Sequence, residues 1–426
     1  MLGSTRRRAT RVPAWLACLA ASLVVGMPAA RAADPPTVCI TPDEFAGSDV
    51  ERINKAIEAA AGRRVVIPPV NAKGKDKAVW LIDSAILVRE GTVLELDNCR
   101  VKLSDRCRDN LIRSANCGLG VTDVKPIKNV HIRGLGTAVL EGADRPRATG
   151  DGNKTVGKHS YGTDSGVAAE SQTSDWRNHG ILLAFVDGFS IQNLTIRDSH
   201  CWAISLERCS HGTIRDVDFA STGSKTIDGV QQTIVNQDGL DLRMGCHDIL
   251  IENITGHVGD DLVALTAIPF ADHAAGAMAT HMATDAKNRG GDQDDIRDVI
   301  IRNVRGYSRG GHHIVRLLNA PGVGMHAILV DGLVDTAPDD VVCRAAVKIG
   351  DADWGGGNAV PGETSRIVVR NVMSRSKHAV LVGGSLVDSS LENVLQEAGR
   401  GDVLTIQSRA DQIRDVTTLN VRAAAR

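Results

Sequence analysis

The 426-residue sequence is poor in aromatic residues and has no marked excess of either charge. Aromatic residues make up 3% of the chain, and the formal net charge is −2. Residues 1–32 contain five arginines and no acid, which leaves 44 basic and 51 acidic groups in the remainder. Such a mildly acidic chain lacks the basic patches that bind nucleic acid or an anionic membrane surface, so we expect neither partner.

Helical periodicity, long apolar runs and metal-binding cysteine pairs are also missing. No apolar stretch keeps a 3.6-residue period for three turns, which argues against a helical repeat. Outside residues 1–32 no segment is apolar enough to span a bilayer. The chain has no Cys-x-x-Cys pair and no Cys/His spacing typical of structural zinc. We therefore expect no metal and no cofactor.

The first 32 residues predict an export signal rather than part of the fold. Four arginines precede an apolar core at residues 15–27, which is too short for an ordinary membrane span. Ala30-Arg31-Ala32 is a small-x-small cleavage site. We therefore expect a secreted or periplasmic protein in which residues 33–426 form a single domain.

The chain does contain a recurring motif: an apolar residue, any residue, Asn, Asp or Gly, and a second apolar residue. Its base step is about 22 residues, and longer steps contain insertions. Short β-branched runs at this period, separated by turn residues, are typical of a parallel solenoid. An ordinary β-sandwich is the alternative that this regular step disfavours. Copies begin at Ile132, Ile191, Ile214, Ile251, Ile301, Val330, Val369, Leu391 and Ile413.

The sequence thus predicts an all-β fold, a right-handed parallel β-helix (solenoid) over residues 65–420. Ile214, Ile251 and Ile301 should lie on one inward-facing row, and the asparagines of the motif should hydrogen-bond from coil to coil. A short amphipathic helix at residues 49–61 should cap the N-terminal end, where an apolar coil would otherwise meet water. Polar, Gly-rich insertions that could carry substrate contacts lie at about 143–178, 220–233, 267–295 and 351–365.

Two cysteines leave a choice open. Cys209 and Cys246 each lie five residues before a copy of the motif, so they should stack on adjacent coils. That separation permits a disulfide. It equally suits a ladder of small apolar side chains inside the coil.

Two pairs of carboxylates lie close to one repeat apart: Asp238 with Asp241, and Asp260 with Asp261. Neighbouring strands of a sheet are about 4.8 Å apart, so stacked coils should bring all four acids to one face. Clustered carboxylates repel one another. A chain that tolerates this repulsion commonly uses the cluster for acid/base chemistry or to hold a cation.

Three segments resemble motifs of a known family: Asp198-Ser199-His200-Cys201-Trp202, Asn236-Gln237-Asp238-Gly239-Leu240-Asp241 and Gly259-Asp260-Asp261. The family they resemble is glycoside hydrolase family 28, the polygalacturonases and their relatives, within the pectate-lyase-like β-helix superfamily. The family carries Asn-Thr-Asp, Gly/Gln-Asp-Asp, Gly-His-Gly and Arg-Ile-Lys motifs, and the likeness spans most of residues 40–420. The third motif corresponds to Gly311-His312-His313, with His313 in place of Gly, and the nearest match to the fourth is Val347-Lys348-Ile349. Of the four motifs, only the first two match well.

The resemblance implies an inverting, polygalacturonase-like enzyme acting on pectin-type or other uronate-containing glycans. In such an enzyme one carboxyl protonates the leaving oxygen while others activate water on the opposite face. Asp260 is then the general acid, Asp238 and Asp261 are the bases, and His312 orients or tunes the acid. Substrate contacts are expected from Asn236, Asp241, Arg316, Lys348 and Trp202.

Some alternatives remain open. Arg316 can receive a uronate carboxylate, which we favour, or pair with Asp260 or Asp261. For Lys348 a solvated charge on the strand is an equal alternative to substrate binding. Trp202 can form an apolar platform for a sugar, although core packing is slightly favoured. The acids can bind calcium in a polysaccharide lyase or epimerase, with a base such as Arg243. A hydrolase with the same mechanism but another substrate, for instance a rhamnogalacturonan or another plant or microbial glycan, is a second alternative. A non-catalytic carbohydrate-binding solenoid is the third. We expect a monomer that acts on a polysaccharide or oligosaccharide.

Overall fold

The computed structural model describes residues 39–107, 109–117, 124–145, 180–234, 236–268, 293–351 and 359–425. The predicted export signal lies outside these residues, as does most of the predicted insertions at 143–178 and 267–295 and about half of the one at 351–365. No helix in the described part of the chain is long and apolar enough to cross a membrane.

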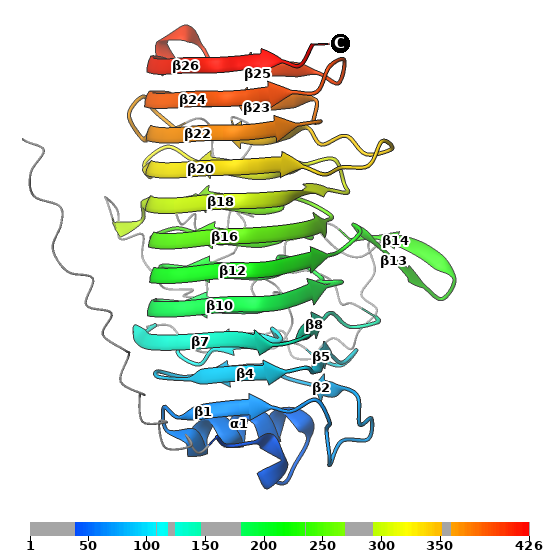
Figure 1. Cartoon of the computed structure of the whole chain (residues 1–426). Helices are drawn as coiled ribbons and strands as arrows, with labels where there is room; N and C mark the ends of the chain where they lie inside the picture. Colours follow the sequence, from blue (N-terminus) through cyan, green and yellow to red (C-terminus); the bar gives the residue numbers. More distant parts are fainter. Residues whose placement is uncertain are drawn as a thin grey trace, which may run out of the picture. The chain divides into compact units, whose positions relative to one another are not determined.

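The described residues form a parallel β-helix, in which each coil lies on the preceding one and contributes strands to two sheets (Figure 1). The predicted fold class is therefore confirmed. The first sheet contains β1 (Arg64–Ile67), β4 (Val93–Asp97), β7 (Ile127–Leu135), β10 (Val186–Arg197), β12 (Ser210–Ala220), β16 (His247–Val258), β18 (Ile296–Ser308), β20 (Met325–Asp335), β22 (Thr364–Ser374), β24 (Leu386–Gln396) and β26 (Ile413–Ala423), in that order. The short strands β2 (Trp80–Ile82), β5 (Arg100–Leu103) and β8 (Val139–Glu141) join it through β10.

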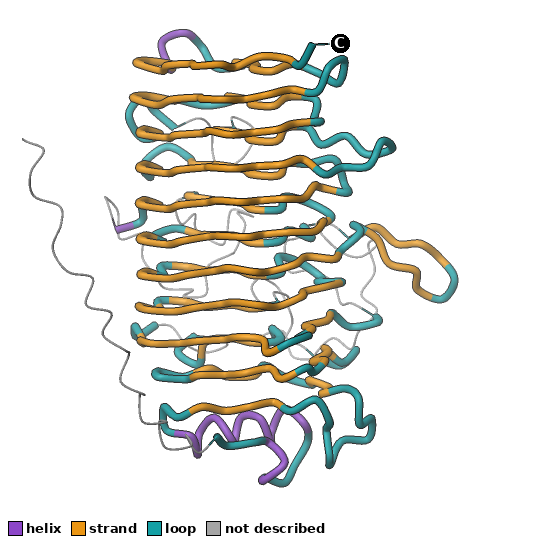
Figure 2. The backbone as a smooth tube through the Cα atoms, in the orientation of Figure 1, coloured by secondary structure: helices purple, strands orange, loops and turns teal. Residues whose placement is uncertain are grey.

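The second sheet carries the functional groups described below. Its strands, also in chain order, are β3 (Ile86–Val88), β6 (Ile112–Ser114), β9 (Ile181–Ala184), β11 (Ile204–Glu207), β15 (Leu240–Arg243), β17 (Val263–Ala267), β19 (His313–Asn319), β21 (Ala345–Ile349), β23 (His378–Val382) and β25 (Asp402–Ile406). An antiparallel hairpin, β13 (Ser224–Ile227) and β14 (Val230–Thr233), projects from the stack at the predicted 220–233 insertion (Figure 2).

The interior is built from rows of apolar residues in register. Ile214 pairs with Ile251, and Ile251 with Ile301, on successive strands of the first sheet. All three are fully buried, so the predicted inward-facing row is confirmed. Burying each such side chain contributes about 1.5–3 kcal/mol, which explains why the apolar positions of the motif recur at every coil.

The asparagine row predicted beside it is also present. Asn253 Nδ2 donates to Asp216 Oδ1 at 2.8 Å, and Asn303 Nδ2 donates to Asn253 Oδ1 at 2.5 Å. The backbone at Asn253 and Asn303 is left-handed, with φ of 57° and 55°. Asn tolerates this conformation better than other side chains that carry a Cβ, so one residue type both turns the chain and links the coils.

The prediction that the motif copy at Ile413 follows the copy at Leu391 in register is wrong. Leu391 pairs with Thr418, whereas Ile413 pairs with Leu386. Asn420 Nδ2 completes the row by donating to Asn393 Oδ1 at 3.0 Å. Strands β24 and β26 each have two left-handed positions, and Asp388 and Asp415 occupy the first while Asn393 and Asn420 occupy the second. The motif reads alike at both positions, so the pattern alone could not distinguish them.

The predicted cap is confirmed as α1 (Asp49–Ala60), which lies against the first coil (Figure 1). Its N-terminus forms a capping box, in which Ser48 N donates to Glu51 Oε2 at 2.8 Å and Ser48 Oγ accepts from Glu51 N at 3.4 Å. Val50, Ile53, Ala56, Ile57 and Ala60 form the buried face that covers the apolar end of the solenoid.

The two stacked cysteines form the apolar ladder and not the disulfide. Cys209 and Cys246 lie on neighbouring coils as predicted, fully buried and with free thiols. Each thiol donates to a backbone carbonyl, Leu183 O at 3.4 Å and Leu206 O at 3.3 Å respectively. Burial raises the pKa of Cys246 to about 12, so this thiol is inert at neutral pH.

Candidate active site

The four acids line one groove of about 1010 Å³. The acids and two histidines lie at the start of three successive strands of the second sheet. Asp238 and Asp241 lie at β15, Asp260 and Asp261 precede β17, and His312 and His313 lie at β19. Because these strands pair in parallel, functional groups far apart in sequence converge.

The register between the two acid pairs is 23 residues rather than the 22 that relates Asp238 to Asp260. Leu240 pairs with Val263, so Asp238 is level with Asp261. The Asp261 N–H donates to Asp238 Oδ1 at 3.2 Å. Asp260 is instead level with Gln237, whose carbonyl accepts from Asp260 N at 3.1 Å.

Asp261 is the anion at the centre of the cluster. Its Oδ1 accepts from His313 Nδ1 at 2.7 Å and from His313 N at 3.0 Å, and its Oδ2 accepts from Arg316 Nη1 at 3.1 Å. Burial alone would raise the pKa of Asp261, but the neighbouring His313 and Arg316 hold the pKa of this carboxyl well below its usual range. Burial lowers the pKa of His313, so the permanent cation that balances Asp261 is Arg316.

The pKa values of Asp238 and Asp241 shift in the opposite direction, upwards. Both are buried, with 5% and 2% of their surface exposed. Burial, followed by repulsion from Asp260, raises the pKa of Asp238 well above its usual range. Burial likewise raises the pKa of Asp241, although Arg243 opposes the shift. Asp261 is therefore the acid of the cluster that ionises most readily, whereas Asp238 and Asp241 retain their protons to higher pH than Asp261 does.

Asp260 is the most exposed of the four acids, with 18% of its side chain accessible. His312 Nδ1 lies 3.2 Å from Asp260 Oδ1, and its ring is half exposed to the groove. The backbone of His312 is fixed by a hydrogen bond from its N–H to Ser308 Oγ at 2.9 Å. The carboxyl implied to be the proton donor is thus the one that a glycosidic oxygen can reach, and its implied partner contacts it.

Among the predicted substrate contacts, Asn236 and Asp241 line the groove. Asn236 Nδ2, Asp241 Oδ2 and His313 Nε2 are buried atoms without a hydrogen-bond partner among the described residues. Leaving such an atom unsatisfied costs about 1–3 kcal/mol. Hydroxyl groups of a bound sugar are suited to satisfy them.

The other three predicted contacts are placed differently. Arg316 lines the groove but pairs with Asp261 and, at 2.7 Å, with Asp351, which is the ion-pair alternative rather than the favoured uronate contact. Lys348 is buried, pairs with Asp351 and does not line the groove. Trp202 lines the groove, but it is 3% exposed and one face is covered by the Arg243 guanidinium, 4.6 Å from the ring centroid. Core packing therefore accounts for Trp202 better than an open sugar platform.

The sequence does not predict a role for two residues of the site. His313 takes the place of a Gly in the resembled motif, and Asp351 lies outside the motifs. Spacing alone could not reveal His313, because 52 residues and an insertion separate it from Asp261, its neighbour in the second sheet. Asp351 could have been found from its spacing of three residues after Lys348.

Asp260, Asp261 and His312 place one ligand atom each within 4.8 Å of one another. This set fits calcium poorly, because calcium prefers six to eight oxygen ligands and His312 offers nitrogen. Both oxygens of Asp261 are also already engaged, by His313 and by Arg316. The geometry thus favours acid/base chemistry over the calcium-dependent alternative.

Comparison with known families identifies this arrangement. Residues 120–269 match the family model described as Glycosyl hydrolases family 28. The chain carries a family 28 glycoside hydrolase domain. The match includes Asn236, Asp238 and both acids of the Asp260–Asp261 pair, and it ends before His312. The resemblance is confirmed, although the matched segment is shorter than the predicted 40–420.

Solved structures support the fold over a longer part of the chain. The hyperthermoactive exopolygalacturonase from Thermotoga maritima is 15% identical, covering 89% of this chain and 94% of that one with a TM-score of 0.53. The endo-xylogalacturonan hydrolase from Aspergillus tubingensis is 13% identical, covering 91% and 92% with a TM-score of 0.51. At this identity the similarity concerns the β-helix alone. Comparison with curated protein sequences gave no significant match.

Proposed function

We propose that this family 28 protein is a secreted, monomeric hydrolase that cleaves a pectin-type or other uronate-containing polysaccharide with inversion of the anomeric carbon. The observation that carries the proposal is the difference in environment between Asp260 and Asp261. Asp260 is accessible and touches His312, whereas Asp261 is buried and anionic between His313 and Arg316. An accessible carboxyl and a buried, ionised carboxylate in the same groove suit the acid and the base of glycoside hydrolysis.

The reaction follows from these positions. Asp260 donates its proton to the glycosidic oxygen as the bond to the anomeric carbon breaks. A water held by Asp238 and Asp261 attacks that carbon from the opposite face and gives its proton to Asp261. The product has a new anomeric hydroxyl of inverted configuration, and proton exchange with water restores Asp260 and Asp261. Asn236, Asp241 and the free Nε2 face of His313 hold the sugar hydroxyls.

A polysaccharide panel tests this function. The purified protein is incubated with pectin-type, other uronate-containing and neutral glycans, and both reducing ends and ultraviolet absorbance are followed. Hydrolysis releases reducing ends without an unsaturated chromophore, and proton NMR of the first products should show the inverted anomer. A chromophore that grows with the reducing ends would indicate a lyase, and binding without cleavage would indicate a non-catalytic solenoid.

Secretion rests on the composition of residues 1–32 and has its own test. The mature protein recovered from the periplasm or the medium should begin at Ala33. A cytoplasmic protein with an intact N-terminus would contradict this part of the proposal.

A further inference from the structure

One buried glutamine joins separate parts of the chain beneath the groove. Gln237 is fully buried. Its side-chain Nε2 donates to Ser199 O at 2.7 Å, and its Oε1 accepts from Gly223 N at 2.7 Å. Its backbone carbonyl accepts from Gly259 N at 3.0 Å and from Asp260 N at 3.1 Å. Gln237 therefore links Ser199, the base of the hairpin and the turn that carries Asp260.

The base of the hairpin also touches this turn directly. A Cβ atom on Gly259 would lie 2.6 Å from Gly223 Cα and 2.9 Å from Gln237 Oε1, so glycine is needed for this close approach. Gly223 also closes the hairpin, because its carbonyl accepts from Ile234 N at 2.9 Å. A displacement of the hairpin base therefore reaches the residue that precedes Asp260 in the chain.

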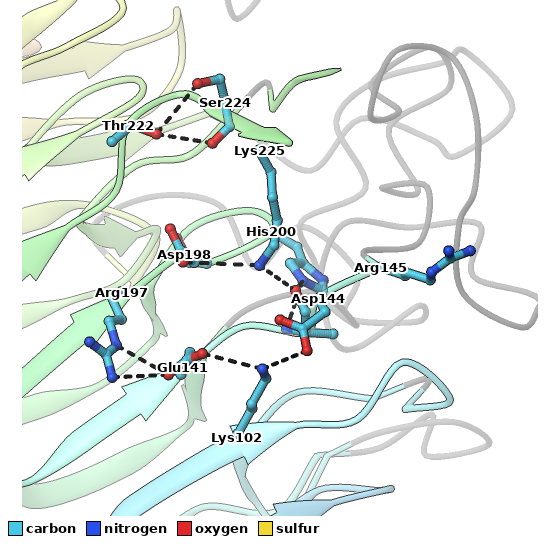
Figure 3. Close-up of polar contacts among 12 residues, drawn as sticks. Lys102, Glu141, Asp144, Arg145, Arg197, Asp198, His200, Thr222, Ser224 and Lys225 are labelled. Carbon is cyan, nitrogen blue, oxygen red and sulfur yellow. Dashed lines mark hydrogen bonds and ion pairs between the residues drawn. The ribbon is translucent and has the colours of Figure 1, made fainter. Parts of the chain in front are cut away.

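The hairpin has a second anchor on the preceding coils. Lys225 Nζ donates to Ala143 O at 2.7 Å and lies 4.0 Å from Asp198 Oδ2. Figure 3 shows this lysine directed towards Asp198, and only 14% of its side chain is exposed. At the root of the hairpin, Thr222 Oγ1 donates to Ser224 O at 2.9 Å (Figure 3). These bonds fix the root of the hairpin to the frame of the solenoid.

The hairpin and Asp260 line the same groove. Ser224, Gln231 and Thr233 of the hairpin lie in its lining together with the four acids. A glycan bound along the groove can therefore contact the hairpin while it presents a linkage to Asp260. Contacts remote from the reacting bond raise kcat when their binding energy helps to place the catalytic group in the transition state. Gln237 supplies the physical connection that such an effect requires.

The resembled motif has a different residue at this position. The family 28 motif reads Asn-Thr-Asp where this chain has Asn236-Gln237-Asp238. The hydroxyl of Thr is attached to Cβ, two carbons closer to the backbone than the amide of Gln, and would not reach Ser199 O and Gly223 N together. The link between the hairpin and the Asp260 turn thus depends on a residue in which this chain departs from the motif.

We propose that Gln237 is a positioning residue that fixes the proton donor Asp260 relative to the β13–β14 hairpin, so that glycan contacts with the hairpin increase kcat. Gln237 does not line the groove, so it acts through Asp260 and not on the sugar itself. This role rests on the proposed hydrolase function. Substrates long enough to reach the hairpin should be turned over faster than short ones that occupy only the cleavage site.

Steady-state kinetics on galacturonate oligomers of increasing length and on their polymer test this role. Gln237→Met keeps the length of the side chain and removes both of its hydrogen bonds. On the polymer its kcat should fall by about tenfold to a hundredfold, the effect of a misplaced catalytic group, with KM little changed. Its kcat should also no longer rise with oligomer length.

Gln396→Met is the matched control. Gln396 is also fully buried and donates to Ser376 O at 2.7 Å, but it lies outside the groove lining. This variant should keep the kcat, the KM and the length dependence of the unmodified protein. Equal falls in kcat in both glutamine variants, or a rise of KM alone in Gln237→Met, would overturn the proposal.

Amide hydrogen exchange separates the proposal from the hydrolase assignment, because it requires no turnover. Lys225→Met removes the second anchor of the hairpin and leaves Gln237 and Asp260 unchanged. It should speed exchange of the Gly259 and Asp260 amides by about twofold to tenfold, the range expected for the loss of one hydrogen bond. Added to Gln237→Met, the same substitution should have no further effect on these amides, because the link is already broken.

Transmission from Lys225 to these amides supports the link even if the unmodified protein releases no reducing ends from any glycan, an outcome that would refute hydrolysis instead. If Gln237→Met does not fold, Lys225→Met alone decides, since its kcat on the polymer should fall as exchange at Asp260 rises. Exchange at Asp260 that is unchanged in Lys225→Met would overturn the proposal whatever the activity.

Discussion

His313 holds Asp261 with two hydrogen bonds to the same carboxylate oxygen, one from its ring at 2.7 Å and one from its backbone at 3.0 Å. Both residues are nearly inaccessible to solvent, with side-chain exposures of 4% and 1%. Family 28 motifs have Gly where this chain has His313. The ring is thus an additional group that fixes the orientation of the base carboxylate and favours its ionised form.

His313→Gly tests this relationship by removing the ring and keeping the backbone donor. The pKa of Asp261 should rise, because the ring bond stabilises the anion. The base must be ionised to act, so the acidic limb of the kcat/KM profile should move to higher pH. His378→Gly is a matched control, since it removes a ring from the same row two coils away. A profile that moves equally in both variants, or in neither, would argue that the ring is only packing.

Arg316→Ala should destabilise the fold rather than only weaken substrate binding. It removes the cation between two buried carboxylates, Asp261 and Asp351, and stranding buried charge costs about 3–5 kcal/mol. The pKa of Asp261 is lowered in the folded protein, so its stabilising contribution is present above the unfolded pKa of about 3.9 and is lost as pH falls through the folded value.

Denaturant unfolding at several pH values checks this prediction. The difference between Arg316→Ala and the unmodified protein should be largest at neutral pH and should shrink in acid. Arg309→Ala, an exposed residue of the same groove, should change stability by less than about 0.5 kcal/mol. Unchanged stability of Arg316→Ala would restore the uronate contact as its main role.

Asp238→Asn should stabilise the protein while abolishing turnover. Burial and repulsion raise the pKa of Asp238, so the unfolded chain ionises first and stability falls as pH rises from the unfolded pKa towards the folded one. Asn removes this penalty and keeps Oδ1 as acceptor for Asp261 N, so a gain of about 1–2 kcal/mol at neutral pH is expected. The gain should diminish below pH 4. Thermal unfolding tests it, with exposed Asp298→Asn as control, and a loss of stability would show that Asp238 is held as an anion.

The solenoid could be predicted from sequence because every coil repeats the same order of inward-facing apolar and outward-facing polar residues. Ile214, Ile251 and Ile301 needed only their spacing to be placed on one row. The prediction failed at Ile413, where Asp415 and Asn420 both occupy left-handed positions and the motif fits either. Local pattern therefore fixes which residues face inward more firmly than it fixes register.

The acids of the site were predictable, but most of their partners were not. Asp238 and Asp261 are close in sequence, and their resemblance to family 28 motifs is direct. The contact between Asp261 and His313 joins residues 52 positions apart across an insertion, so spacing alone could not show that their coils adjoin. For Arg316 the chemistry allowed two partners, and only the positions of Asp261 and Asp351 distinguish them.

The central claim is that Asp260 donates the proton in a metal-independent hydrolysis, and the rate of reducing-end release by Asp260→Asn tests it most directly. The variant keeps the shape of the side chain and removes its acidity, so turnover should fall by about 10²–10⁴-fold while glycan binding and unfolding temperature stay close to those of the unmodified protein. The unmodified protein should keep its rate in a chelator. Full activity in Asp260→Asn, or activity of the unmodified protein that disappears on chelation and returns with calcium, would contradict the account.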